Sequence, residues 1–194
     1  MRIVAGQFRG RVLAAPRTQA IRPTSERLRE SLFNILAHRF EGAVEGARVL
    51  DLFAGTGALG LEALSRGAGF AAFVDDGAEA RGLLRANIEA LGLGGVTRIL
   101  KRDATRLGAM TSFDAFTLVF CDPPYGKGFG EKALASALAG GWLAPDALVV
   151  LEERAGEGIV LPEGLSAVDK REAGESQLVF ARVAAADTAP PILP

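Results

Sequence analysis

The sequence predicts an α/β fold in which a seven-stranded, mostly parallel sheet carries helices on both faces. From residue 48 onward, short apolar runs typical of buried strands alternate with stretches of helical periodicity. Acidic residues stand at or near the ends of the first four predicted strands, at positions 51, 75, 103 and 122. Repeated strand–helix units of this kind favour parallel strands joined by crossover helices.

Composition narrows the class of protein. The chain has 194 residues, of which 49% are hydrophobic, enough for one domain with a substantial core. Its apolar runs are shorter than a membrane span and no signal peptide follows Met1, so we expect a cytoplasmic protein without membrane contact. One cysteine and one histidine argue against a disulfide framework and a zinc site, and we expect no metal.

Charge is distributed unevenly along the chain. Residues 1–40 contain eight arginines against two glutamates, an excess of six positive charges, and the rest contains fourteen basic and twenty-one acidic residues, an excess of seven negative charges. Arginine forms bidentate contacts with phosphate and stacks on bases. The basic end therefore indicates either a nucleic-acid partner or a merely solvated basic helix face.

The first forty residues are predicted to form an N-terminal extension made of a β-hairpin and a helix. In residues 1–15, Ile3-Val4 and Val12-Leu13 flank a turn. A proline at position 23 cannot lie inside a helix, so Thr24 and the serine after it are expected to cap the helix that follows. Arg27 and Arg29 lie off the apolar face of that helix.

The remaining elements follow in order. Strands are predicted at residues 49–53, 70–75, 96–100, 116–121 and 147–152, with a closing hairpin at 166–171 and 177–183. Helices are predicted after the glycine turn to Ser65, to Leu91, and over 134–138. We therefore expect an extension at 1–40, a catalytic domain at 41–183 and a disordered Ala/Pro-rich tail at 184–194.

A glycine loop follows the first of these strands, in the stretch DLFAGTGALG from Asp51 to Gly60. Gly55 and Gly57 let the backbone approach a ligand, Gly60 eases helix packing, and Asp75 has the spacing of a ribose-binding carboxylate. NAD and S-adenosylmethionine both fit these features. Asp51 favours S-adenosylmethionine, because a carboxylate is unfavourable beside a pyrophosphate and favourable near an ammonium group.

Other interpretations of the strand-end acids stay open. Asp51 also fits a local turn former, and Asp75 and Asp76 also fit helix caps, although either one fits a ribose ligand. Asp103 with Ala104 fits an adenine contact and equally the cap of the next helix.

The fourth predicted strand leads into Cys121-Asp122-Pro123-Pro124-Tyr125. The prolines stiffen this turn and leave carbonyl acceptors beside the Asp122 carboxylate. Asp122 and the Pro123 carbonyl are suited to hold the two hydrogens of a nucleobase amine, and Tyr125, the one tyrosine of the chain, to stack on a base taken out of its helix. By strand alternation Cys121 points to the opposite side and is expected in the core.

These motifs together resemble the RsmD family of class I methyltransferases, which have a Rossmann-like fold. The resemblance is carried by DLFAGTG and DPPY, by VAGQFRGR and RPTSERLRESLFN in the first forty residues, and by GALGLEALSRGA and GWLAPDALVVLE. It runs from about residue 2 to 183. It implies methylation of the exocyclic N2 of one guanine of 16S rRNA, position 966 in the usual numbering, within the small ribosomal subunit.

The resemblance also implies roles for individual residues. The S-adenosylmethionine site would comprise Asp51, Phe53, Gly55, Thr56, Gly57, Asp75, Asp76, Asp103 and Ala104. Asp122, Pro123 and Tyr125 would hold the guanine. The RNA contacts would comprise Arg9, Arg11, Arg22, Thr24, Arg27 and Arg29. A monomer is expected, and no role is assigned to the segment 171–174.

Several other functions remain in competition. A DPPY-type DNA adenine N6-methyltransferase would use the same amine chemistry, but such enzymes usually carry a target-recognition insertion for which this chain has little room. A protein glutamine methyltransferase would typically have Asn in place of Asp122. A non-catalytic RNA-binding assembly factor predicts a degraded cofactor loop, and an NAD oxidoreductase conflicts with Asp51.

Overall fold

The seven-stranded sheet is present in the computed structural model, which describes residues 1–15 and 25–184. Its strands are β1 Arg48–Leu52, β2 Phe70–Val74, β3 Thr97–Leu100, β4 Phe116–Cys121, β5 Leu143–Arg154, β6 Leu165–Ala173 and β7 Ser176–Val183, in the spatial order β3-β2-β1-β4-β5-β7-β6. The first five are parallel and β7 is antiparallel to both of its neighbours, which confirms the predicted topology.

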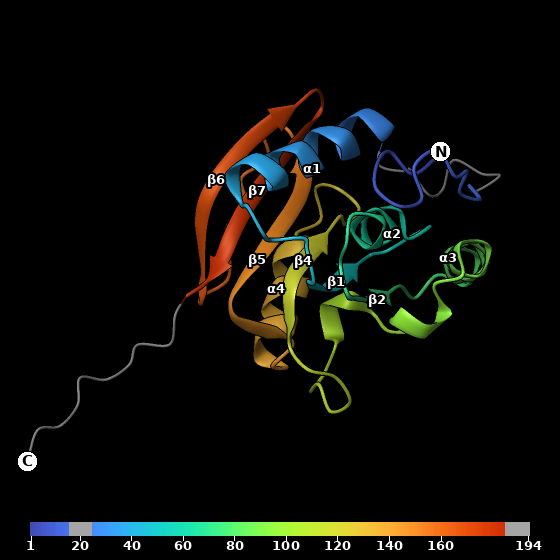
Figure 1. The fold of residues 1–194 in the computed structure, drawn as a ribbon. Helices are drawn as coiled ribbons and strands as arrows, with labels where there is room; N and C mark the ends of the chain where they lie inside the picture. Colours follow the sequence, from blue (N-terminus) through green and yellow to red (C-terminus); the bar gives the residue numbers. More distant parts are fainter. Residues whose placement is uncertain (16–24, 185–194) are drawn as a thin grey trace, which may run out of the picture.

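Helices cover both faces of this sheet (Figure 1). They are α1 Glu26–Arg39, α2 Ala58–Ser65, α3 Ala78–Leu91 and α4 Phe129–Ala139, with short 3₁₀ turns η1 Gly94–Val96 and η2 Ala104–Arg106. The first three pack on one face and α4 with η2 on the other. No helix in the described part of the chain is long and apolar enough to cross a membrane.

Two of these elements begin four or five residues before the start that the sequence predicts. Helix α4 begins five residues before 134, after Gly128 in the left-handed region at φ 61°. Strand β5 begins four residues before 147, but its pairing with β4 is irregular between Phe116 and Leu118, and Asp146 has φ 60°. These irregular residues are partly exposed and break the apolar pattern by which a strand is recognised.

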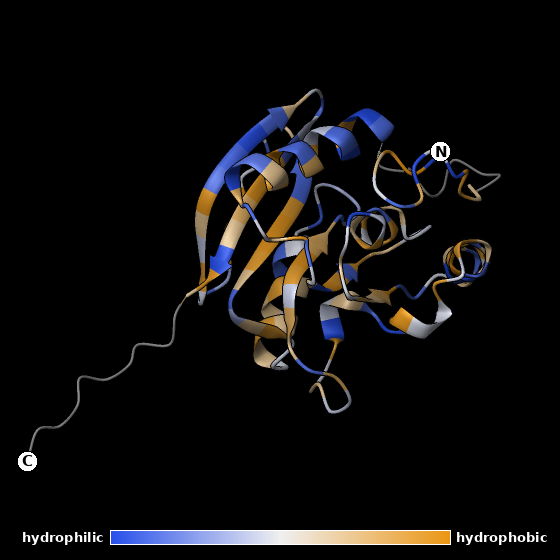
Figure 2. Cartoon of the chain, viewed as in Figure 1, coloured by the Kyte–Doolittle hydropathy of each residue, from blue (hydrophilic) through white to orange (hydrophobic). Residues whose placement is uncertain are grey.

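Alternation along the strands separates two layers of core. Val49, Phe73 and Phe120 face α1, α2 and α3. The alternate residues of the same strands, which include Cys121, face α4. Cys121 is buried there, which confirms its predicted place in the core. Figure 2 shows the central strands β4 and β5 as hydrophobic and the edge strand β6 as largely hydrophilic. Asp51 lies on the face of the sheet that carries the first three helices.

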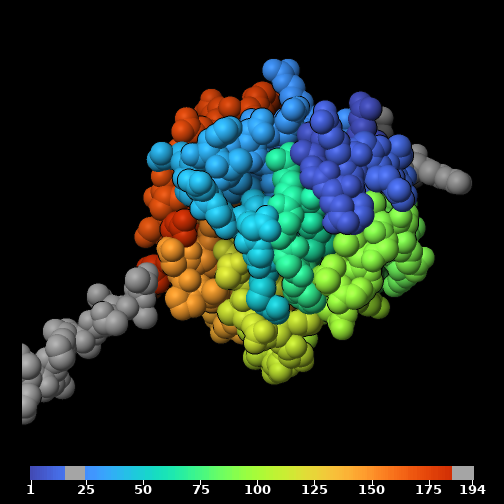
Figure 3. All heavy atoms as spheres, in the orientation of Figure 1, coloured from blue at the N-terminus to red at the C-terminus, as the bar shows by residue number. Residues whose placement is uncertain are grey.

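The N-terminal segment 1–15 packs on α2, where Figure 3 shows it beside that helix. Its two arms run antiparallel, with Ile3 N donating to Arg11 O and Gly10 N to Ile3 O. A single bridge, Arg2–Val12, takes the place of the expected pair of strands. Gly6 explains the close approach: at φ 82°, a Cβ there would lie 1.9 Å from the Ser65 carbonyl oxygen.

Candidate active site

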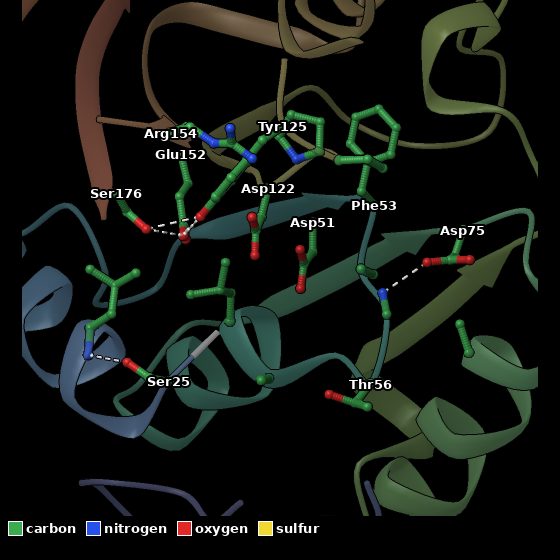
Figure 4. Close-up of a pocket in the computed structure, with 18 of the residues that line it drawn as sticks. Ser25, Asp51, Phe53, Thr56, Asp75, Asp122, Tyr125, Glu152, Arg154 and Ser176 are labelled. Atoms are coloured by element: carbon green, nitrogen blue, oxygen red, sulfur yellow. Dashed lines mark hydrogen bonds between the residues drawn. The ribbon is translucent and has the colours of Figure 1, made fainter. Parts of the chain in front are cut away.

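A cavity of about 1210 Å³ opens at the carboxyl ends of β1, β2, β4 and β5, which is where ligands bind in open α/β sheets. The predicted residues that line it are Asp51, Phe53, Gly55, Thr56, Asp75, Asp76, Asp122, Pro123, Tyr125 and Arg27. Figure 4 shows Asp51, Asp75 and Asp122 arranged around one space. The two halves of the sequence motif, the glycine loop and the DPPY turn, therefore face the same cavity.

The aspartate that follows β2, Asp75, fixes the conformation of the glycine loop. Gly55 N donates to Asp75 Oδ2 at 2.8 Å and Gly77 N donates to Asp75 Oδ1 at 2.8 Å. Phe53 has φ 60°, a rare conformation for a residue with a side chain, and Gly57 has φ 79° where α2 begins. Asp76 lies beside them and is more exposed than Asp75. The loop is thus preorganised, with two carboxylates at its lip.

Asp51 is buried with little compensation for its charge. Its side chain is 1% exposed, and Oδ2 accepts one hydrogen bond from Gly60 N at 2.9 Å. Burial raises the pKa of this carboxyl well above its ordinary value, the bond from Gly60 opposes the rise, and the negative charges of Asp122 and Asp75 add to it. A cation placed in the cavity would relieve this unfavourable state.

Gly60 is required for the position of the Asp51 carboxylate. A Cβ at position 60 would lie 3.1 Å from Asp51 Oδ2 and 2.4 Å from Cε1 of Phe73. Its amide could then no longer approach the carboxylate so closely. The third glycine of the loop therefore packs α2 against β1, as the sequence predicts.

The DPPY turn is anchored to the neighbouring strands. Asp122 N donates to Leu52 O at 3.4 Å, which joins the turn to the end of β1. The Tyr125 hydroxyl donates to Glu152 Oε1 and lies 2.9 Å from Ser176 Oγ. Burial, followed by the bond to Glu152, raises the pKa of Tyr125, so the hydroxyl remains a neutral donor. The ring of Tyr125 is half-buried at the cavity wall.

Sequence reasoning missed the wall that β5 and the β6–β7 hairpin contribute. Glu152, Arg154, Ser176 and the segment 172–175 line the cavity, although the sequence assigns no role to 171–174. Glu152 follows the apolar run of β5 and has the alternation that places it on the cavity side. This signal is present in the sequence, but Ser176 reaches the cavity only through the antiparallel pairing of β7 with β5.

Three residues predicted to bind the cofactor lie outside the lining of this cavity. Gly57 begins α2 instead. Asp103 is exposed, and its Oδ1 accepts hydrogen bonds from the amide and the hydroxyl of Thr105, so it caps η2. Ala104 is buried in the core beside α4. Asp103 therefore caps η2 through Oδ1. The adenine contact expected of Asp103 and Ala104 stays a prediction.

Arg29 corrects the predicted set of RNA contacts. Its side chain is fully buried between α1 and α2, where its guanidinium donates to the Arg2 carbonyl and lies 3.8 Å from Glu62. Arg29 is therefore an internal tie rather than an RNA contact. The periodicity of α1 could not reveal this, because the partner lies 33 residues away in another helix.

The other predicted RNA contacts divide into two groups. Arg9, Arg11 and Arg27 are exposed, and Arg11 also donates to the Ala90 carbonyl at 3.0 Å. Arg22 and Thr24 lie outside the described residues. The helix begins after Ser25, whose Oγ accepts the Leu28 amide. Among the described residues, no group of three or more His, Cys, Asp or Glu side chains is arranged to hold a metal ion.

Comparisons with known proteins agree with this geometry. The model of the family described as conserved hypothetical protein 95 matches residues 1–182. Ribosomal RNA small subunit methyltransferase D of Escherichia coli K12 is 37% identical over 177 residues, 90% of this chain and 86% of that protein. The solved structure of the putative methyltransferase yhhF from Escherichia coli superposes with a TM-score of 0.80 at 34% identity, covering 96% of this chain and 99% of the other.

A more distant structure resembles this one in fold. An RNA methyltransferase from Salinibacter ruber, solved in complex with S-adenosyl-L-homocysteine, superposes with a TM-score of 0.62 at 13% identity, covering 89% of this chain and 99% of the other. The arrangement of strands and helices is therefore that of methyltransferases with a Rossmann-like fold.

Proposed function

This chain belongs to the family of conserved hypothetical protein 95, here called RsmD, and we propose that it methylates the exocyclic N2 of one guanine in 16S rRNA. Relatives named ribosomal RNA small subunit methyltransferase support an rRNA substrate. The main support for the proposal is that one cavity contains both the DPPY turn and the buried Asp51 carboxylate, whose charge has a single hydrogen bond. The first suits a cationic methyl donor and the second an amine.

The residues of the glycine loop fit S-adenosylmethionine. Asp51 would face its cationic amino-acid end, the backbone of residues 53–56 would lie along it, and Asp75 and Asp76 would face its ribose hydroxyls. Gly55, at φ 56°, lets the loop backbone approach a ligand closely, and Gly60 lets α2 pack against Asp51 and Phe73. When bound, this cofactor supplies an electrophilic methyl group.

Asp122 and the DPPY backbone would position the acceptor amine. A guanine amine has two N–H donors, and its lone pair is delocalised into the ring. Hydrogen bonds from these donors to the Asp122 carboxylate and the Pro123 carbonyl would orient the nitrogen and favour the pyramidal form that attacks a methyl group. Tyr125, held by Glu152 and Ser176, would stack on the extruded base.

The N-terminal extension would bring the RNA to this cavity. Arg27 lines the cavity and also a second groove of about 760 Å³ along α1, together with His38, Arg39 and Arg171. Arg9 and Arg11 lie exposed on the segment that packs on α2. We propose that residues 1–40, without Arg29, bind rRNA, that 41–183 carry out the transfer, and that the protein works as a cytoplasmic monomer on the small subunit.

Replacement of Asp122 tests the proposal. We predict that Asp122→Ala lowers the rate of labelled methyl transfer to unmethylated small subunits by at least about a thousandfold, because it removes the group that orients the amine. Binding of S-adenosylmethionine, measured by calorimetry, should remain. The matched control is Asp114→Ala, an exposed acid away from the cavity. Unchanged turnover in Asp122→Ala would contradict the assignment.

A further inference from the structure

Glu152 lies beside Asp122 on the same face of the sheet. The last register pair of β4 and β5 is Cys121–Leu151, and the residues that follow this pair are Asp122, just after β4, and Glu152 in β5. Because neighbouring parallel strands in register present their side chains to the same face, both carboxylates face the cavity. Figure 4 shows the carboxylates of Glu152, Asp122 and Asp51 side by side, extending in the same direction.

The orientation of Glu152 is fixed by two hydroxyl groups. Its Oε1 accepts the Tyr125 hydroxyl and, at 3.0 Å, the Ser176 hydroxyl. These donors come from the DPPY turn and from β7, so two segments distant in sequence from β5 hold the carboxylate. The side chain is only 6% exposed yet lines the cavity. Glu152 is therefore a preorganised hydrogen-bond acceptor at the cavity wall.

A second carboxylate beside the amine-binding group would distinguish nucleobases by the atom that lies next to their amine. In guanine, the N2 amine is adjacent to N1–H, so two neighbouring positions are donors. In adenine the amine is adjacent to N1, which carries a lone pair, and in cytosine it is adjacent to N3, which also carries one. A carboxylate next to the amine-binding group therefore attracts guanine and repels the other two bases.

We propose that Glu152 accepts the N1–H of the target guanine while Asp122 holds its N2 amine, so that Glu152 selects the base. The inference rests on the proposed function, since it concerns the same base in the same cavity. Tyr125 and Ser176 then act as positioning residues, because they hold Glu152 in place in addition to any contact between the Tyr125 ring and the base. An adenine methyltransferase with the same DPPY turn would need a donor at this position instead.

The test compares guanine with 2-aminopurine, which keeps the N2 amine but has a lone pair at N1. Small subunits are reconstituted from ligated 16S rRNA carrying either base at the target, and kcat/KM for methyl transfer is measured on both. The wild-type protein should prefer guanine by about ten- to a hundredfold, the effect of one hydrogen bond to a charged group. A ratio near one would overturn the inference while leaving guanine methylation intact.

Glu152→Gln sharpens the same measurement. Its amide oxygen can keep the bonds from Tyr125 and Ser176, and its NH₂ group would then face N1, where it suits 2-aminopurine and opposes guanine. The preference for guanine should therefore fall about tenfold or more. An unchanged ratio in an active Glu152→Gln protein would overturn the inference.

A control variant, Tyr125→Phe, separates base selection by Glu152 from a purely structural role of its carboxylate. Tyr125→Phe removes the hydroxyl but keeps Glu152, so it should lower turnover with a smaller change in the guanine preference. If both variants change the preference equally, Glu152 serves only to hold Tyr125, and the inference fails. If wild-type protein methylates no guanine-containing subunit, the proposed function itself fails. If Glu152→Gln does not fold, as judged by thermal melting, the wild-type ratio alone decides.

Discussion

Two buried carboxylates, Asp51 at the end of β1 and Glu62 in α2, lie in the same core under very different conditions. Glu62 is fully buried and accepts the amides of Val4 and Ala5 at 2.8 and 3.0 Å, while Arg66 lies 2.8 Å away. Asp51 is just as buried but accepts one amide and faces two other acids. The protein compensates the charge of Glu62, whereas the charge of Asp51 has a single hydrogen bond, which fits its proposed role toward a cationic ligand.

This difference separates scaffold from site. Glu62 joins the N-terminal segment, α1 and α2, since Arg29 also lies 3.8 Å from it. Burial lowers the pKa of the Arg29 guanidinium, and the charge of Glu62 opposes that shift. Asp51 contributes an unfavourable charge to the folded protein, a cost that natural proteins accept at functional positions. Removing the Glu62 carboxylate should therefore lower the stability of the folded protein, and removing the Asp51 charge should raise it.

The largest effect is expected at Glu62. Glu62→Ala leaves Arg29 buried without its carboxylate and two amides without their acceptor, so we predict a loss of about 3–5 kcal/mol in the free energy of unfolding. Urea denaturation measures it. Glu89→Ala, at an exposed position of α3, is the control and should change stability by less than about 0.5 kcal/mol. A similarly small change in Glu62→Ala would remove the distinction between the two carboxylates.

Asp51→Asn should act in the reverse sense. The side-chain oxygen of Asn can still accept the Gly60 amide, and the buried charge is gone, so the melting temperature of the ligand-free protein at pH 7 should rise. Affinity for S-adenosylmethionine should fall about ten- to a hundredfold with the loss of a charged partner. Calorimetry and thermal melting together measure both. A variant that is less stable but binds normally would show that Asp51 is structural.

A smaller effect is expected from pH. Because the pKa of Asp51 is raised in the folded protein above its ordinary value of 3.8, its contribution to folding stability is lost as pH rises through the interval between these values. A bound cation favours the ionised carboxylate, so affinity for S-adenosylmethionine should increase over the same interval with release of a proton. Asp51→Asn should lack this component. Equal pH profiles for both proteins would contradict the role of Asp51.

The smallest effect is expected for Arg9 and Arg11, which lie on the N-terminal segment that Glu62 holds in place. Arg9→Ala with Arg11→Ala should weaken binding to rRNA and reduce the slope of log affinity against log salt by roughly 1.5, about 0.7–0.9 for each phosphate contact. The control replaces Arg98 and Arg106, which are exposed on other elements. Identical salt slopes for the parent protein and the Arg9/Arg11 variant would remove their phosphate role.

The local sequence pattern was enough to predict the sheet and the half of the cavity that the glycine loop and the DPPY turn form. The apolar strands, the glycine loop and Asp51 and Asp122 at the strand ends are set by short-range sequence, and the topology of parallel sheets brings their ends together. This is why the sequence predicts a cavity at this edge of the sheet.

The features that the sequence pattern did not predict depend mostly on contacts between residues that are distant in sequence. Arg29 looks like a solvated helix residue until Glu62 is placed opposite it in α2. Ser176 reaches Tyr125 only because β7 pairs with β5. The sequence pattern did not reveal that Asp103 Oδ1 accepts two hydrogen bonds from Thr105 and caps η2. Each case depends on a contact between distant segments or on a local competition of hydrogen bonds, which periodicity does not encode.

The identity of the methylated nucleoside tests the central claim most directly. Small subunits from a strain that lacks the modification are incubated with the protein and labelled S-adenosylmethionine, and the rRNA is digested and analysed by mass. We predict N2-methylguanosine at a single position. N6-methyladenosine, or labelled product in DNA instead of rRNA, would contradict it.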